Sequence, residues 1–211
     1  MTKKTKTRTR LSPEARENEI LAYAAQVVSQ EGVIAVSIEQ IGKALNISKS
    51  TVYSYFPSTT ELLKELLKRE MKSLRSAQHK AMENANTVEQ VIRDVTHIYL
   101  NYIEEKGLLI SRLQSEPSLS SVGGPADYGK DFAIKYMAEI LRDTFGIPLA
   151  IGIPSVSITF GLPDSAGRCL IEKLADKQTI EDLTVAMILA CIRTTTEGYD
   201  LKFRTLPKRN S

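Results

Sequence analysis

Apolar side chains recur at helical spacing along almost the whole chain. From residue 13 onward they repeat three or four residues apart, as on the buried face of an amphipathic helix. Serine or threonine precedes most of these stretches and can cap the free N–H groups of a first turn. The pattern predicts an all-α fold of about nine helices. We expect them at residues 13–31, 38–45, 49–55, 59–84, 87–106, 108–114, 127–145, 163–177 and 180–201, with caps at Ser12, Ser37, Ser48, Ser58, Thr87 and Thr179.

Three later segments need separate interpretation. Gly107 is expected to end one helix, and residues 115–125, rich in Ser, Gly and Pro, are expected to form a loop. Within residues 147–163, apolar and polar residues alternate as in a strand, but a lone strand has no partner, so helix or irregular chain is favoured. The run from Leu183 to Ile192 is apolar on nearly all sides, which predicts burial on more than one side. A second subunit could supply that cover.

The two short helices expected at residues 38–45 and 49–55 form a candidate helix-turn-helix. Asn46 tolerates the left-handed backbone that a tight turn requires. The second helix of such a motif lies in the DNA major groove, where acidic side chains would repel phosphate. Residues 48–55 contain no acid and offer one lysine, several hydroxyls and two phenols. An ordinary pair of core helices is the alternative on this pattern alone.

Charge is concentrated at the N-terminus. The chain carries a net charge of +3, and residues 1–70 account for all of it. The excess comes from a basic arm made of Lys3, Lys4, Lys6, Arg8 and Arg10. Such an arm suggests an anionic partner such as DNA, although a solubilising tail would have the same composition.

Other chemistry is sparse. We expect no membrane span, because no run of eighteen apolar residues occurs, and no secretory signal, because no apolar run follows the basic arm. We therefore expect a cytoplasmic protein. Cys169 and Cys191 are interpreted as small buried thiols, with a redox switch as the alternative. His79 and His97 lack partners at metal-ligand spacing, and phosphate-binding glycine loops and nucleophile motifs are missing, so neither a metal, a cofactor nor an enzyme is expected.

Several short motifs agree in register over residues 16–67. They are ILAYAA at 20–25, EG at 31–32, SIEQIG at 37–42, ISKSTVYSYFPS at 47–58 and ELL at 61–63. This stretch resembles the N-terminal domain of TetR-family repressors. The resemblance implies a helix-turn-helix DNA-binding domain at residues 12–58, after a basic arm at 1–11. It also implies a helical ligand-binding and dimerisation domain at 59–205, before a short tail at 206–211.

The resemblance also implies which residues touch DNA. The matching positions are Ser37, Lys49, Ser50, Thr51, Tyr53 and Tyr55. Ser48, at the cap of the second helix, and Thr59, which can still donate one neutral hydrogen bond, are further candidate DNA contacts. Thr59 departs from the family, which usually has a lysine there that approaches a phosphate. We therefore expect the basic arm to compensate through the minor groove, so that deleting residues 2–10 weakens DNA binding and flattens its salt dependence.

For the remaining domain the resemblance implies architecture only. Two long helices, expected at 163–176 and 180–201, would pair two subunits, so that a homodimer binds a palindromic operator. A small-molecule inducer would release the DNA, which makes a repressor the first hypothesis, and the sequence leaves activation open because the sign depends on the operator position. A helical adaptor protein, or less readily an enzyme, is the alternative. Pocket candidates combine apolar walls with polar groups. They are His97, Tyr99, Tyr102, Arg112, Gln114, Phe132 and Tyr136.

Overall fold

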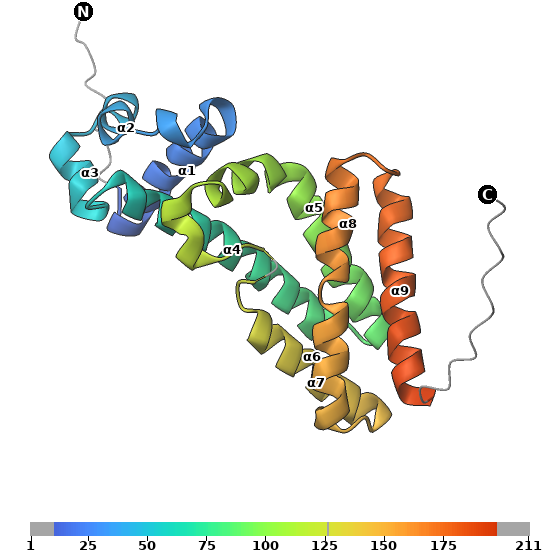
Figure 1. Ribbon diagram of the computed structural model, residues 1–211. Coiled ribbons are helices and arrows are strands. Elements are labelled where there is room, and N and C mark those ends of the chain that lie inside the picture. Colours follow the sequence, from blue (N-terminus) through green and yellow to red (C-terminus); the bar gives the residue numbers. More distant parts are fainter. Residues whose placement is uncertain (1–10, 126, 198–211) are drawn as a thin grey trace, which may run out of the picture. The chain divides into compact units, whose positions relative to one another are not determined.

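The computed structural model describes residues 11–125 and 127–197, and this part of the chain is helical without a strand (Figure 1). The all-α prediction is confirmed. In chain order the helices are α1 (Pro13–Glu31), the 3-10 turn η1 (Val33–Ala35), α2 (Ile38–Leu45), α3 (Lys49–Tyr55), α4 (Thr59–Asn84), α5 (Val88–Gln114), the 3-10 turn η2 (Pro117–Val122), α6 (Lys130–Phe145), α7 (Leu149–Thr159), α8 (Leu162–Ile171) and α9 (Lys177–Glu197).

The chain divides into two compact units. The first takes in residues up to Ala77 together with Asn101–Tyr128. Its core joins apolar side chains of α1, α2 and α3 to the beginning of α4 and the end of α5. The innermost members are Ile20, Val28, Ile41, Val52, Leu62, Leu66, Met71 and Leu113. The helix-turn-helix is therefore held by a core that extends well beyond its own residues.

Local capping fixes the beginnings of four helices as predicted. The N–H groups of Ala15, Gln40, Thr51 and Glu61 each donate to the hydroxyl of the serine three residues earlier, at 3.1–3.2 Å. Thr87 receives the N–H of Gln90 in the same way at 3.1 Å. These bonds satisfy N–H groups that have no partner inside the helix, which explains why each helix begins at that point.

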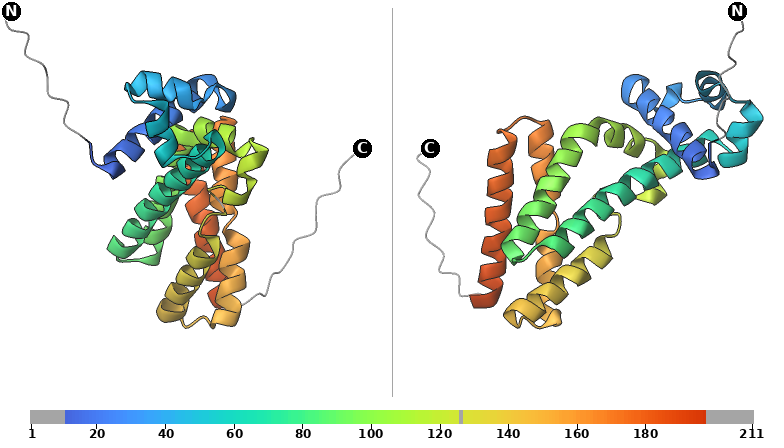
Figure 2. Two further views of the ribbon diagram at one scale, coloured as in Figure 1. Left: turned by 90° about the vertical axis from the view of Figure 1, so that its left-hand side faces the viewer. Right: turned by 180° about the vertical axis from the view of Figure 1, so that it is seen from behind.

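Among the described residues, the second unit comprises Gln78–Leu100 and residues 129–197. Within it α6 packs on α7, where Gly152 lies close to Ala138, and α9 packs on both α7 and α8. Figure 1 and the right view of Figure 2 show α8 and α9 side by side. A small core of Ile134, Ala138, Leu141, Ile147 and Val156 joins α6 to α7.

Helices α5 and α7 differ from, or resolve, what the sequence predicted. Gly107 does not end a helix, because α5 runs through it to Gln114. A glycine inside a helix costs only about 1 kcal/mol, and the burial of Leu109 and Ile110 beyond it outweighs that cost. Residues 149–159 form α7, as the preference for helix over strand anticipated.

The boundaries around α6, α8 and α9 also differ from prediction. Helix α6 begins at Lys130 rather than at residue 127, and α8 ends at Ile171, before Lys173 takes a left-handed conformation with φ 55°. The cap of α9 is Asp176, not Thr179, because the Thr179 N–H donates to the Asp176 carboxylate at 2.9 Å. This hydrogen bond lowers the pKa of Asp176.

The structure also bears on the expectations for the cysteines, for membrane spans and for the chain ends. Cys191 is exposed and Cys169 half-buried, so the prediction of two buried thiols is wrong; the apolar neighbours of Cys191 in sequence also lie partly on the surface of α9. No helix among the described residues combines the length and the apolar content needed to cross a bilayer. The basic arm, and the end of the last predicted helix beyond residue 197, lie outside the described residues.

Candidate nucleic-acid interface

The turn between α2 and α3 is built by three residues. Asn46 takes the left-handed conformation with φ 52°, as predicted, and its N–H donates to the Lys43 carbonyl. The Ile47 N–H then donates to the Gly42 carbonyl at 2.9 Å. A side chain at Gly42 would place its Cβ 3.0 Å from the Ile47 carbonyl oxygen, so the turn closes tightly because residue 42 is glycine.

Helix α3 has one face in the core and one in solvent. Val52 and Phe56 are fully buried in the first unit, whereas Lys49, Ser50, Tyr53 and Ser54 are exposed. Of the other predicted DNA contacts, Ser37 and Ser48 are exposed. Thr51, Tyr55 and Thr59 are half-buried, and Tyr55 packs against the core. The structure therefore separates the predicted residues into an accessible group and a partly covered one.

Hydroxyl groups form a cluster at the start of α3. The Ser48 hydroxyl lies 2.8 Å from that of Ser50 and 2.7 Å from that of Thr51, and Ser54 donates to the Thr51 carbonyl. Thr51 is thus oriented toward the helix cap. Ser48 and Ser50 combine exposure with a hydroxyl that can donate to a phosphate or a base edge.

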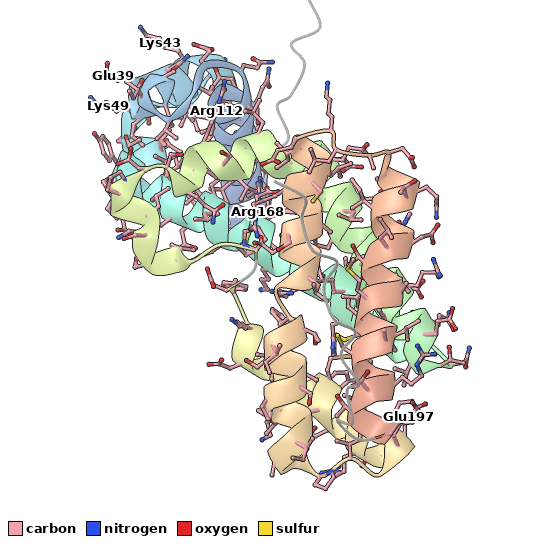
Figure 3. All side chains as sticks on the ribbon, turned by 45° about the vertical axis from the view of Figure 1, so that its right-hand side comes forward. Glu39, Lys43, Lys49, Arg112, Arg168 and Glu197 are labelled. Carbon is pink, nitrogen blue, oxygen red and sulfur yellow. The ribbon has the colours of Figure 1, made fainter. Side chains whose placement is uncertain are left out.

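Lys49, the one cation of α3, is engaged by an acid on α2. Its ammonium group pairs with the carboxylate of Glu39 and lies 5.9 Å from the centre of the Tyr53 ring. The hydrogen bond between the two charged groups raises the pKa of Lys49 and lowers the pKa of Glu39, so both stay ionised at neutral pH. Figure 3 shows Glu39, Lys43 and Lys49 on one side of the helix pair, where they border an open cleft of about 280 Å³.

Sequence interpretation did not identify Glu39 as part of this surface. An acid in the first turn of a helix is ordinary, because it is favoured by the helix dipole, and so carries no signal of a partner. The partner lies ten residues away, across the turn. Only the path of the backbone through Asn46 brings the two groups together.

The predicted pocket residues are divided between the two compact units. Tyr102, Arg112 and Gln114 belong to the first unit, whereas His97, Tyr99, Phe132 and Tyr136 belong to the second. Arg112 donates to the carbonyls of Val28 and Ser29 at 2.7 and 2.8 Å, in the last turn of α1. Gln114 packs against Gly124, whose missing side chain leaves room for the amide.

In the second unit the candidates join helices to one another. His97 pairs with the buried carboxylate of Glu181 at 2.8 Å, and the Tyr99 hydroxyl donates to Asp164 at 3.1 Å. Phe132 stacks on Tyr136 with a ring separation of 6.2 Å, and His79 meets both rings edge-on. No cluster of three metal-ligating side chains occurs within residues 11–125 and 127–197.

Comparison with known proteins finds a family whose model matches the residues of this helix-turn-helix. The model of the family described as "Bacterial regulatory proteins, tetR family" matches residues 20–66, which include all of α2 and α3. A curated relative is the "HTH-type transcriptional activator FasR" of Mycolicibacterium smegmatis, which is 26% identical over 95 residues, or 45% of this chain and 43% of the relative. The match thus spans less than half the length of that relative.

Solved structures extend the likeness to the whole fold. A TetR-like transcriptional regulator from Rhodococcus sp. RHA1 is 19% identical with a TM-score of 0.64, covering 87% of this chain and 99% of its own. The "Flavonoid-responsive Regulator FrrA" is 21% identical with the same TM-score, covering 85% and 95%. The helix-turn-helix of this chain thus matches the model of the tetR family of bacterial regulators over residues 20–66, and the chain shares its fold with TetR-like transcriptional regulators.

Proposed function

We propose that the protein is a homodimeric repressor that binds a palindromic operator through α3 and is released from it by a small molecule. The observation that carries DNA binding is the two-sided α3, with Val52 and Phe56 anchored in the core and an acid-free face in solvent. This is the arrangement that lets a short helix enter the major groove without displacing its own scaffold. We place its action in the cytoplasm, where a bacterial operator lies.

The proposed contacts follow from exposure. Lys49, Ser50 and Tyr53 face solvent on α3 and are proposed to reach base edges and nearby phosphates. Ser37 and Ser48 are exposed at helix N-termini, where phosphate is attracted by free N–H groups. Thr51, Tyr55 and Thr59 are half-buried and are proposed as secondary contacts. The basic arm at residues 1–11 is proposed to add positive charge in the minor groove through its cations at residues 3–10.

The proposed dimer rests on exposed apolar side chains in the last helices. Ile171 and Leu174, and on α9 Leu183 and Met187, are each more than half exposed. Helix α7 adds Ile158, which is 82% exposed, and residues 144–163 carry no charged side chain. Large apolar side chains left exposed on neighbouring helices support an interface with another protein surface. A second copy would present the same exposed apolar side chains, which suits a two-fold contact.

The proposed ligand response is supported by the fold and by one neighbour. FrrA, with the same fold, responds to flavonoids according to its name. We propose that an aromatic or otherwise apolar small molecule acts on the second unit, where His97, Tyr99, Phe132 and Tyr136 offer aromatic and polar groups. Binding would lower DNA affinity only by as much as the ligand favours the state that does not bind DNA.

Selection of bound duplexes from a random pool tests the proposal directly. We expect the enriched sequences to be palindromic, with half-site centres separated by about 10 base pairs or a multiple of that distance. Sequencing of the bound fraction gives the half-site, the symmetry and the spacing in one experiment. Failure to enrich any sequence, with folded protein, would contradict the proposal, and enrichment of a single unpaired half-site would contradict the dimer.

Two substitutions at Ser37 test its proposed phosphate contact. Aspartate and asparagine both cap a helix about as well as serine, so both variants should keep the hydrogen bond from Gln40 and melt close to the original protein. Ser37→Asp places a negative charge at the phosphate, and we expect operator affinity about tenfold below that of Ser37→Asn. Equal operator affinity of the two variants, measured by fluorescence anisotropy, would show that Ser37 does not face phosphate.

A further inference from the structure

Glu39 lies beside the proposed DNA-binding face of α3, where the negative charge of a carboxylate would weaken DNA binding. Its side chain is 64% exposed on the side of α2 that also presents Lys43, next to the solvent face of α3. Its carboxylate holds the ammonium group of Lys49, which is itself 51% exposed. A carboxylate in this position would be expected to repel phosphate. Its presence next to the only cation of α3 therefore needs a functional explanation.

The ion pair changes what Lys49 can contribute to different DNAs. Non-specific affinity comes from cations that neutralise phosphates and release counterions. A lysine already neutralised by Glu39 gains little from an arbitrary phosphate, because it exchanges one anion for another. A guanine edge or a phosphate at a fixed position offers a directed acceptor, which only the correct sequence and register supply. The pair is exposed, so its exchange is easy when a better partner is present.

We propose that Glu39 is a positioning residue that holds Lys49 back from non-specific DNA and so widens the difference in affinity between operator and other sequences. The inference rests on the proposed function, because it requires that α3 binds DNA. The neighbouring groups fit it. Lys43 lies close enough to Glu39 to help lower the pKa of its carboxyl, and the Tyr53 ring lies near the Lys49 ammonium from within α3.

The test uses the full-length protein and two DNA probes. One is a mixed-sequence duplex of about 25 base pairs, and the other carries the operator obtained by selection. Affinities are measured by anisotropy at several salt concentrations from about 50 to 200 mM. The variants are Glu39→Gln and Glu39→Asp, with Glu17→Gln as the matched control, since Glu17 is an exposed carboxylate on α1 and its replacement changes the net charge equally.

Removal of the Glu39 charge is expected to strengthen binding to the mixed-sequence duplex about fivefold, with a smaller gain on the operator. The salt dependence on the mixed duplex should steepen by about one counterion, because Lys49 now neutralises a phosphate. Glu39→Asp should restore the original discrimination in large part. Glu17→Gln should leave the ratio of the two affinities as it was.

A double variant decides whether Glu39 acts through Lys49. In a Lys49→Met background the effect of Glu39→Gln on discrimination should disappear, whereas simple repulsion of phosphate by Glu39 would leave it in place and overturn the proposal. Equal gains on both duplexes, or no gain, would also overturn it. If the unaltered protein binds neither duplex, the proposed function fails as well; if it binds both and only the Glu39 results disagree, the proposed function stands and this inference alone is wrong.

Discussion

Leu183→Glu is expected to make the protein monomeric and to lower its operator affinity at least a hundredfold. Leu183 lies on α9 with 53% of its surface exposed, next to Met187 on the same helix face. In a two-fold interface the substitution occurs twice, so two carboxylates would be buried without a partner. A monomer would bind one half-site only. It would lose the additional affinity that a dimer gains because its two DNA-binding domains are linked. Sedimentation at micromolar concentration measures the first effect, and anisotropy with the selected operator measures the second.

Ser76→Glu supplies the matched control for this experiment. It adds the same charge at an exposed position on α4, a helix that is not part of the proposed interface. We expect it to stay dimeric and to bind the operator as before. Both variants change exposed side chains, so circular dichroism should show unchanged helix content. A dimeric Leu183→Glu protein would mean that subunits pair through another surface, and a monomeric Ser76→Glu protein would mean that the effect is not specific to α9.

Arg112→Met is expected to lower the free energy of unfolding by about 3 kcal/mol. The guanidinium of Arg112 donates two hydrogen bonds, to the carbonyls of Val28 and Ser29, and each hydrogen bond from a charged donor contributes about 1.5–3 kcal/mol. These carbonyls belong to the last turn of α1, where the helix dipole also favours a cation. Methionine keeps the apolar part of the side chain but leaves both interactions unmade. Urea denaturation at fixed protein concentration measures the loss.

Two further variants bracket the effect of Arg112. Arg112→Lys keeps the charge but not the planar donor group, so it should recover only part of the stability. Arg142→Met removes an exposed arginine that pairs with its neighbour Asp143, and it should change stability little. If Arg112→Met unfolds at the same urea concentration as the original protein, the bonds to α1 do not hold the first unit together.

The beginnings of the helices could be predicted because their causes are local. Ser12, Ser37 and Ser48 each bond to an N–H group three residues away, so the capping pattern is legible in the sequence itself. The left-handed Asn46 could be anticipated for the same reason. Gly107 shows the limit of local propensity, because burial of the residues beyond it keeps α5 helical. Asp176 was overlooked because Thr179, three residues later, is an equally acceptable cap.

For the candidate site, too, the local features could be predicted and the contacts between distant residues could not. The acid-free face of α3 could be predicted from composition, and the structure exposes Lys49, Ser50 and Tyr53 there. The ion pair between Lys49 and Glu39 could not be predicted, because ten residues and a turn separate the two side chains in the sequence. Arg112 was expected to meet a ligand, but the carbonyls that it binds lie more than eighty residues earlier. A helical pattern predicts which face of a helix is apolar, not which element packs against it.

The discontinuous make-up of the first unit has a consequence for synthesis on the ribosome. Its core requires Leu109, Ile110 and Leu113 from the end of α5 and Leu119 from η2, all encoded well after α3. The nascent chain therefore presents α1 to α4 before the side chains that complete their core have been made. We expect the helix-turn-helix to gain protection from proteolysis only after about residue 119 has left the exit tunnel. A gene fragment ending where the family match ends, at residue 66, would encode a chain without these core residues.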